Sequence, residues 1–288
     1  MMHLDWLEPG RTAVITGAAD GVGRAAALKF AGLGLNVLLA DRNAVGLEDA
    51  AETARALAPG GAVMDTFVLD VADAEQVLAL KRHAFDRFGD VAVLMNNAGI
   101  GGGGGPFGPP ESWARVLGVN LWGVIHGVQA FGEAMVAQDR PAAIINTGSK
   151  QGITTPPGDT AYNVSKAGVK VLTEALEHSL RTTSGGKVRA HLLIPGFTFT
   201  GITRPAGGEK PPGAWTADQV IDFALERMAA GDFYILCPDN EVTREVDNAR
   251  ITWAAQDITQ NRPPLSRWHS DWKDPFAAFI AAQGAVQE

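Results

Sequence analysis

The sequence contains a single cysteine, Cys237, among its 288 residues. One thiol cannot form a disulfide within the chain, and a protein without disulfides is typical of a reducing compartment. No stretch approaches the ~18 uninterrupted apolar residues that a membrane-spanning helix requires. The segment from Met1 to Glu8 also lacks the basic start and the apolar run of a secretion signal. These absences favour a cytoplasmic protein with no membrane partner.

The chain also has few positive charges, with 24 Lys and Arg residues against 32 Asp and Glu residues. The net charge of -8 argues against nucleic acid as a partner, because a phosphate backbone attracts concentrated positive charge. The 6 histidines are scattered without the spacing of metal ligands, so no metal site is expected. Ser149 has no Gly-x-Ser-x-Gly frame, which argues against a hydrolase with that nucleophile.

What is present is an alternation of short apolar runs, rich in β-branched residues, with longer helical patterns. The runs that predict strands are 12–16, 36–40, 63–69, 91–95, 143–146, 188–194 and 233–236. Strands that alternate with helices predict an α/β protein with a parallel sheet. Because the runs are continuously apolar, we expect helices to cover both faces of that sheet.

The composition changes after Pro195. Residues 201–217 are rich in glycine and proline, and we expect them to form a mobile substrate flap over the strand ends. The tail over 241–288 holds a predicted helix over 241–257 and the aromatic residues Trp268, Trp272, Phe276 and Phe279. Side chains of that size are usually docked, either on the body or on a second subunit. The expected organisation is one main domain over 1–240 that includes the flap, followed by a helical, aromatic tail over 241–288.

The first predicted strand leads into a glycine turn, Thr16-Gly17-Ala18-Ala19-Asp20-Gly21-Val22-Gly23, and a helical stretch follows. Glycines between a strand and a helix let the backbone approach a pyrophosphate at the helix N-terminus. This context favours a dinucleotide site over an ordinary glycine turn. The candidate cofactor-binding residues here are Gly17, Asp20, Gly21, Val22 and Gly23.

An acidic residue, Asp41, ends the second predicted strand, 24 residues after Gly17 (41 − 17). This is near the ~20-residue spacing at which a carboxylate binds the ribose hydroxyls of NAD. The charges of Asp41 and Asp20 would repel the 2′-phosphate of NADP, so NAD is the expected cofactor and NADP the less favoured one. Arg42 is the counterargument, because its guanidinium can pair with that phosphate or stack on adenine. A strand-end cap is the alternative role for Asp41.

Polar segments also end the third and fourth predicted strands. Asp70-Val71 ends the third and Asn96-Asn97-Ala98-Gly99 ends the fourth, at the edge where open α/β sheets bind ligands. We expect Asp70, Val71, Asn97, Ala98 and Gly99 to contact the cofactor, while Asp70 is also suited to cap the helix predicted over 72–88. The glycines at 101–105 either leave room beside the reacting end or form a solvent loop.

Tyr162 and Lys166 stand four residues apart, which places them on one face of a helix. A tyrosine has an ordinary pKa of about 10, and a neighbouring ammonium group favours its charged form and lowers that pKa. Such a phenol can exchange a proton with an alcohol or a ketone. Ser149 lies 13 residues upstream (162 − 149). A surface lysine beside a half-buried tyrosine is the structural alternative.

In their order along the chain, these motifs resemble the short-chain dehydrogenases/reductases in their compact, single-domain form. The matching residues span about 10–200 and are Thr-Gly-x-x-x-Gly-x-Gly at 16–23, Asp70, Asn-Asn-Ala-Gly at 96–99, Asn120, Ser149, Tyr162, Lys166, Pro195, Gly196, Thr198 and Thr200. The resemblance implies a Rossmann-type, doubly wound sheet of seven strands, with an NAD-binding site and hydride transfer on the B face of nicotinamide. The glycine spacing argues against a nucleotide-sugar epimerase or dehydratase.

The resemblance also implies roles for the matching residues. Tyr162 would be the acid/base, Lys166 would lower its pKa and bind the nicotinamide ribose, and Ser149 would donate to the substrate oxygen. Asn120 would hold a water that links Lys166 to solvent, unless neighbouring backbone satisfies its amide instead. The nicotinamide would be bound by Pro195, Gly196, Thr198 and Thr200, although Thr198 stands where the family most often has Val or Ile.

We therefore expect an NAD-dependent short-chain alcohol dehydrogenase or ketoreductase that interconverts a secondary alcohol and a ketone. An apolar or aromatic substrate is suggested by residues that flank the predicted site, namely Ile100, Phe107, Ile153, Phe197, Phe199 and Trp215. The alternatives are a catalytically silent dinucleotide-binding sensor or scaffold, and a reductase of an activated C=C bond, a reaction that commonly uses a wider Tyr-Lys spacing. The family further implies a homodimer or homotetramer that pairs the helices over 111–138 and 160–181.

Overall fold

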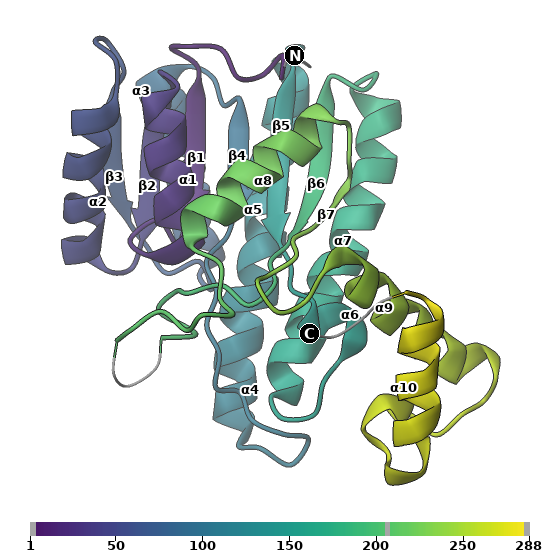
Figure 1. Ribbon diagram of the computed structural model, residues 1–288. Coiled ribbons are helices and arrows are strands. Elements are labelled where there is room, and N and C mark those ends of the chain that lie inside the picture. The colour runs from purple at the N-terminus through teal and green to yellow at the C-terminus, as the bar shows by residue number, and fades with distance from the viewer. Residues whose placement is uncertain (1–3, 205–207, 285–288) are drawn as a thin grey trace.

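Figure 1 shows the computed structural model of the protein, which describes residues 4–204 and 208–284. Its centre is a parallel sheet of seven strands in the order β3-β2-β1-β4-β5-β6-β7. The strands are β1 (Thr12–Thr16), β2 (Asn36–Asp41), β3 (Met64–Val68), β4 (Val93–Asn96), β5 (Ala142–Thr147), β6 (Val188–Ile194) and β7 (Tyr234–Leu236). The predicted doubly wound sheet is confirmed. The strand order reverses between β1 and β4, and such a switch point opens a crevice at the carboxyl ends of the strands.

Helices cover both faces of the sheet (Figure 1). Those on one face are α1 (Gly21–Gly32), α2 (Ala44–Leu57) and α8 (Ala217–Ala229), and those on the other are α3 (Ala74–Phe88), α5 (Gly123–Ala137) and α7 (Thr160–Thr183). Successive residues of a strand point to opposite faces, so Ile15 packs into the first core and Val14 into the second. Burial of both faces explains why the strands are apolar throughout.

The helix expected over 111–138 is interrupted. α4 (Pro110–Leu117) runs into a π-helical turn, Gly118–Trp122, before α5 begins. The buried side chain of Asn120 lies within this turn. Single π-turns inside α-helices are often found at functional sites, because the altered hydrogen bonding redirects the side chains that they carry.

The segment that follows β6 crosses the carboxyl ends of the strands. Its two described arms pair with each other, since Phe199 N donates to Trp215 O at 2.9 Å and Trp215 N donates to Phe197 O at 2.9 Å. The expected flap over 201–217 falls within this segment. Residues 205–207 of the flap lie outside the described residues, and so do residues 285–288 of the tail.

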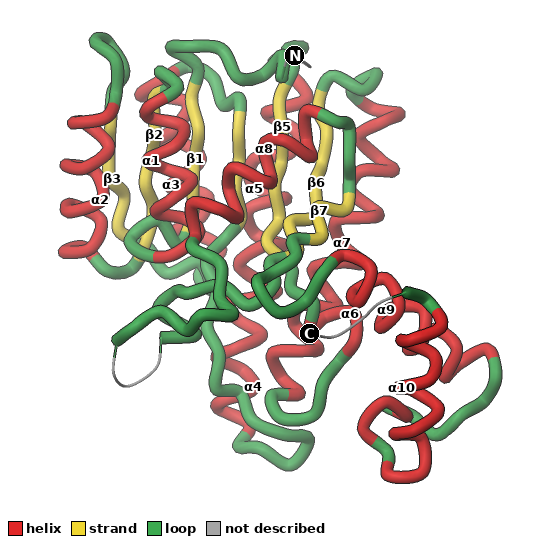
Figure 2. The backbone as a smooth tube through the Cα atoms, viewed as in Figure 1, coloured by secondary structure: helices red, strands yellow, loops and turns green. Residues whose placement is uncertain are grey.

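The C-terminal segment is helical and lies beyond the carboxyl ends of the strands, on the β7 side (Figure 2). It comprises α9 (Arg244–Thr259), two 3₁₀ turns (Ser266–Trp268 and Ser270–Trp272) and α10 (Lys273–Ala282). Trp253 of α9 packs against Phe276 and Phe279, with ring centroids 5.3 and 5.2 Å apart, and Arg262 stacks on Trp253 at 3.9 Å. The aromatic residues therefore form a small core of their own, while α9 contacts α6 (Gln151–Thr154) of the body. Among the described helices, none has both the length and the apolar character needed to cross a bilayer.

Candidate active site

A cavity of about 550 Å³ opens at the carboxyl ends of the strands. The predicted site residues that line it are Gly17, Asp20, Gly21, Val22, Asp41, Arg42, Asp70, Val71, Asn97, Ala98, Gly99, Ser149, Tyr162, Lys166, Pro195, Gly196, Thr198 and Thr200. Gly23 and Asn120 are not among its lining residues. The fold therefore brings segments from nearly 200 residues of sequence to one place.

The glycine turn between β1 and α1 has no room for side chains. Gly17 and Gly21 have φ angles of +68° and +57°, in the left-handed region that favours glycine. A Cβ on Gly23 would lie 2.2 Å from Gly17 O, and one on Gly17 would lie 2.8 Å from Ala98 Cα. Gly23 thus acts through close packing rather than through the cavity surface. A bare backbone turn at the N-terminus of α1 fits the phosphates of a dinucleotide.

One carboxylate lies within this turn and another lies beside it, and the two are held in different ways. Asp41 accepts hydrogen bonds from Ala19 N at 3.2 Å and Asn43 N at 3.0 Å, so it caps the strand end and lines the cavity at once. Asp20 caps α1 by accepting from Gly21 N at 2.7 Å, and it pairs with Arg204 at 3.6 Å. Arg204 therefore offsets part of the charge of Asp20, whereas no cation is paired with Asp41 among the ion pairs of the described residues.

The ends of β3 and β4 are held by side-chain hydrogen bonds. Asp70 accepts from Ala72 N at 2.9 Å, whereas the cap of α3 is Asp73, which accepts from Glu75 N and Gln76 N. Asp70 is therefore free of the capping role that was its alternative. Asn97 donates to Thr16 O at 3.2 Å and accepts from Thr147 Oγ1 at 3.2 Å, which ties the ends of β1, β4 and β5 together.

Tyr162 and Lys166 lie on α7, one turn apart, and Ser149 follows the end of β5. The N-terminus of α7 is capped by Asp159, which accepts from Tyr162 N at 3.2 Å. The hydroxyl of Ser149 lies near that of Tyr162 and acts on its pKa as a hydrogen-bonding partner. Lys166 is buried and donates to Thr147 O at 2.8 Å, with its Nζ 5.7 Å from the centroid of the Tyr162 ring. The three side chains thus share one end of the cavity.

The electrostatics of this end differ from the expectation that Lys166 lowers the pKa of Tyr162. Burial raises the pKa of Tyr162, the hydrogen bond with Ser149 opposes that rise, and the nearby carboxylate of Asp159 adds to it. Burial also lowers the pKa of Lys166 to about 8. Loss of water around each group disfavours its charged form, and this is the largest cause of both shifts.

The buried amide of Asn120 is satisfied by backbone and by one hydroxyl. Its Oδ1 accepts from Ile100 N at 2.8 Å, while its Nδ2 donates to Ile100 O at 2.9 Å and to Ser165 Oγ at 3.2 Å. A Cβ on the intervening Gly99 would lie 3.6 Å from both Asn120 Oδ1 and Lys166 Nζ. Asn120 therefore anchors the loop after β4 beside Lys166, and the water that it would hold remains a prediction.

The predicted substrate-contacting residues are mostly elsewhere. Of the six, only Ile100 lines the cavity as described; Phe107 is 102% exposed, and Trp215 packs edge-on against Phe223 at 5.7 Å. Residues that line the cavity but were not singled out from the sequence are Leu69, Arg115, Val119, Thr147 and Gly148. Gly101, Gly201, Ile202 and Thr203 also line it and belong to the glycine run and the flap that were expected beside the site. Arg115 and Val119 could have been found from the sequence. They are four residues apart in a predicted helix, and Val119 is the neighbour of the candidate residue Asn120.

A Rossmann-type sheet whose carboxyl edge gathers a glycine turn and a Ser, Tyr and Lys set defines a dinucleotide-dependent oxidoreductase. The family model described as short chain dehydrogenase matches residues 11–210. The chain belongs to this family, and the resemblance in its motifs is confirmed.

Relatives agree with this assignment. The chain is 31% identical to 1-deoxy-11-beta-hydroxypentalenate dehydrogenase of Streptomyces exfoliatus, over 97% of this chain and 98% of that protein. A short chain dehydrogenase/reductase from Burkholderia phymatum in complex with NAD is 37% identical, with a TM-score of 0.78, covering 89% of this chain and 96% of the other. A metagenomic short-chain oxidoreductase in complex with NADP is 27% identical, with a TM-score of 0.66, covering 81% and 98%.

Proposed function

We propose that this oxidoreductase uses NAD to interconvert a secondary alcohol and a ketone on a small-molecule substrate. The observation that carries the proposal is the single cavity that Ser149, Tyr162 and Lys166 line at one end and Asp41 lines at the other. A site of this length matches a dinucleotide with a substrate beside its reactive ring.

Ser149, Tyr162 and Lys166 form the tyrosine end of the cavity, and the glycine turn with Asp41 forms its glycine end. Each of the three residues of the tyrosine end has a role in the proposed reaction. A bound nicotinamide would supply or accept the hydride. The Tyr162 hydroxyl would give its proton to the substrate oxygen during reduction and take it back during oxidation. Ser149 would donate a hydrogen bond to the same oxygen while negative charge develops there. Lys166, held by Thr147 O, would stabilise the phenolate form of Tyr162 and bind the nicotinamide ribose.

The choice of NAD rests on Asp41. Its carboxylate is fixed by two backbone N–H groups at the end of β2, where a ribose 2′-phosphate would meet it. Like charges brought together in this way disfavour NADP. The similar structure with NAD is 37% identical to this chain and the one with NADP is 27% identical, which supports the same choice.

The choice of an alcohol rests on the chemistry of the site and on one relative. The name of the Streptomyces protein denotes a dehydrogenase of an 11-beta-hydroxy compound. Among the lining residues, Ile100, Val119 and Ile202 present apolar side chains, which supports an apolar substrate skeleton.

A substrate screen tests the proposal. NADH formation would be followed with a panel of secondary alcohols, and NADH consumption with the matching ketones and with enoyl thioesters. Turnover of alcohols and ketones that disappears in Tyr162→Phe is the expected result. Turnover of enoyl thioesters alone would replace the proposal with C=C reduction, and NADH binding without turnover of any compound would point to a sensor.

We further propose that the protein is a cytoplasmic homo-oligomer. Apolar side chains on the helices expected to pair remain exposed, with Trp122 53%, Val164 43% and Val171 63% accessible. Light scattering would give the mass in solution. A monomer at micromolar concentration would contradict this part of the proposal.

A further inference from the structure

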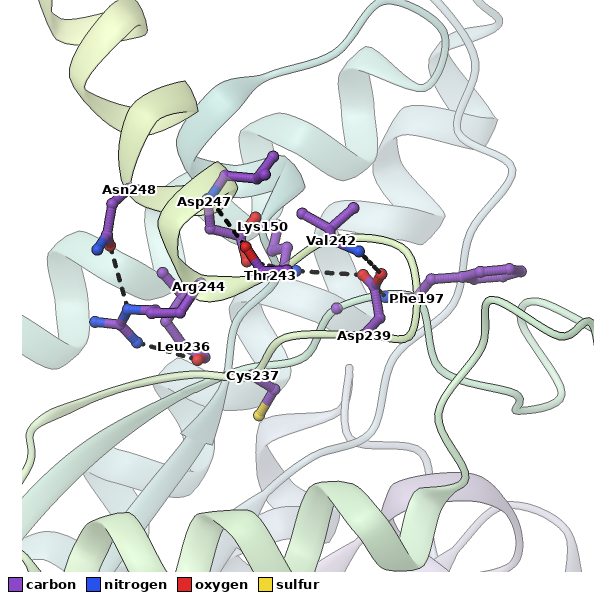
Figure 3. Close-up of polar contacts among 12 residues, drawn as sticks. Lys150, Phe197, Leu236, Cys237, Asp239, Val242, Thr243, Arg244, Asp247 and Asn248 are labelled. Carbon is purple, nitrogen blue, oxygen red and sulfur yellow. Dashed lines mark hydrogen bonds and ion pairs between the residues drawn. The ribbon is translucent and has the colours of Figure 1, made fainter. Parts of the chain in front are cut away.

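Lys150, Asp239 and Asp247 meet in one group of charges (Figure 3), and none of the three lines the cavity. Lys150 follows Ser149 in the chain, and its Nζ lies 2.6 Å from Asp247 Oδ2 and 3.3 Å from Asp239 Oδ2. Asp247 belongs to α9 of the C-terminal segment, and Asp239 belongs to the connection between β7 and α9. The side chains are 17%, 5% and 5% exposed for Lys150, Asp239 and Asp247, so this is a buried ion group.

Asp239 joins this group to the turn that follows β6. Its Oδ2 accepts from Phe197 N at 3.1 Å, and its Oδ1 accepts from Val242 N at 2.8 Å (Figure 3). A Cβ on Gly196 would lie 2.7 Å from Asp239 Oδ2 and 2.9 Å from Lys150 Nζ. The ion group therefore packs directly against the Pro195-Gly196 turn, which lines the cavity.

Lys150 in turn precedes α6, which packs on the catalytic helix. Gly152 N donates to Ser149 O at 3.0 Å, and Gln151 N donates to Ser149 Oγ at 3.1 Å. A Cβ on Gly152 would lie 2.5 Å from the backbone carbon of Lys166, so α6 and α7 are in close backbone contact. A shift of Lys150 would consequently move Ser149 relative to Tyr162.

Stability alone does not explain these charges. A buried ion pair loses much hydration when it forms, and apolar residues of similar size often serve stability as well or better. Arg250 and Arg267 add positive charge near Asp247. Burial raises the pKa of the neighbouring Cys237 thiol to about 12, so this thiol stays protonated and unreactive. The ion group does fix the positions of three chain segments relative to one another: the residues before α6, the connection after β7, and α9.

We propose that Lys150, Asp239 and Asp247 form a positioning network that holds Ser149 in place against Tyr162, and that the C-terminal segment contributes to turnover through Asp247. This inference rests on the proposed alcohol and ketone chemistry. Asp247 contacts neither substrate nor cofactor in the proposed reaction, and Asp239, which holds the turn after β6, is left unchanged in the test. The loss of Asp247 is therefore expected to lower kcat and not to change the binding constants.

The test compares wild type with Asp247→Asn and with the double variant Lys150→Met/Asp247→Asn. Asp247→Asn leaves Lys150 paired with Asp239 at 3.3 Å, so the remaining buried charges stay balanced and the variant should fold. The double variant also removes the cation, and Asp239 then keeps only its backbone donors. We expect kcat to fall about tenfold, because a small displacement of a reacting group slows the chemical step. KM and the NADH Kd should stay within about twofold of wild type. The matched control is Lys29→Met/Asp222→Asn, which removes an exposed pair of 2.6 Å between α1 and α8 and should leave kcat unchanged.

A second background separates positioning from a general loss of structure. In Ser149→Ala protein, loss of Asp247 should lower the residual kcat by less than about twofold, because the group that it positions is gone. A full tenfold loss in that background would overturn the inference, and so would wild-type kcat in a folded double variant. These outcomes leave the proposed function intact, whereas a wild-type protein that turns over no alcohol or ketone overturns the proposed function and the inference with it.

Discussion

The glycine end of the cavity and its tyrosine end are held together by different forces. At the glycine end, backbone atoms approach so closely that a Cβ on Gly23 would lie 2.2 Å from Gly17 O. The carboxylates there, Asp20 and Asp41, are partly open to water. At the tyrosine end, Lys166 is 3% exposed, and the nearby side chains of Lys150 and Asp247 are 17% and 5% exposed.

This difference determines which changes each end tolerates. Where backbone packs on backbone, added volume is the change that lowers stability most, because the backbone cannot rotate away as a side chain can. Where charges are buried, removal of one charge is the change that lowers stability most, because its partner is then left unpaired in a region of low dielectric constant. The following predictions test the contrast, in order of decreasing effect.

Tyr162→Phe removes one hydroxyl and almost no volume. We expect turnover to fall by about 10³-fold, the range for loss of a general acid/base, with NADH binding nearly intact. Steady-state rates and NADH fluorescence titration measure the two quantities. A variant that keeps most of its rate would remove Tyr162 from the mechanism.

The buried charge of Lys166 predicts a pH dependence of stability. Burial lowers its pKa from 10.5 to about 8, so between those values the folded protein releases a proton that the unfolded chain retains. The unfolded state then binds more protons, and Lys166 makes the free energy of unfolding rise with pH in this window, by up to about 3 kcal/mol.

Urea denaturation of wild type and Lys166→Met from pH 7 to 10.5 measures this effect as the difference between the two proteins. Lys170→Met, which removes a half-exposed lysine on the same helix, is the control and should leave the pH dependence unchanged. A wild-type minus Lys166→Met difference that does not vary with pH would contradict the lowered pKa.

Gly23→Ala adds one methyl group to the glycine end. We expect it to destabilise the protein by about 2 kcal/mol, because the new Cβ has no space beside Gly17 O. Gly32→Ala, in the same helix, is the control: nothing lies within 4 Å of its Cβ, so stability should be equal or up to about 1 kcal/mol higher. Chemical denaturation gives the free energy of unfolding of both variants. Equal values would show that the turn has room for a Cβ at Gly23.

Asp41→Ser removes a charge from the more open glycine end. We expect the ratio of kcat/KM with NAD to kcat/KM with NADP to fall about tenfold, since a repulsion of roughly 1.4 kcal/mol is lost. Stability should change little, which is the contrast with the buried end. A ratio that stays at the wild-type value would assign cofactor choice to another residue, with Arg42 the first to examine.

The two ends also differed in how well they could be predicted. The turn at Gly17 and Gly21 was predictable because positive φ angles and close approach demand glycine, whatever surrounds them. Asp41 and Asn97 were predictable because parallel strands deliver their last residues to one edge. Thr198 and Thr200 were expected at the cavity from the family resemblance alone, and both line it.

Other features had no local signature. The side chain of Asn120, within the π-turn, is hydrogen-bonded to Ile100 and Ser165, which come from elsewhere in the fold. The aromatic residues assigned to the substrate were chosen by their nearness in sequence, but Phe107 points to solvent and Trp215 packs on α8. The pairing of Lys150 with Asp247 joins residues 97 positions apart (247 − 150), a separation at which no spacing rule applies.

The sequence by itself determined the order of strands and helices, the glycine turn and the pair of Tyr162 and Lys166, because each depends on local backbone geometry or on spacing within one element. Ser149 was added to that pair by the order of the motifs along the chain, which resembles the family. Only the tertiary structure decided the balance of charge around these three residues. Burial is a property of the whole fold, and it is burial that raises the pKa of Tyr162, lowers that of Lys166 and encloses Lys150 between two carboxylates from the end of the chain.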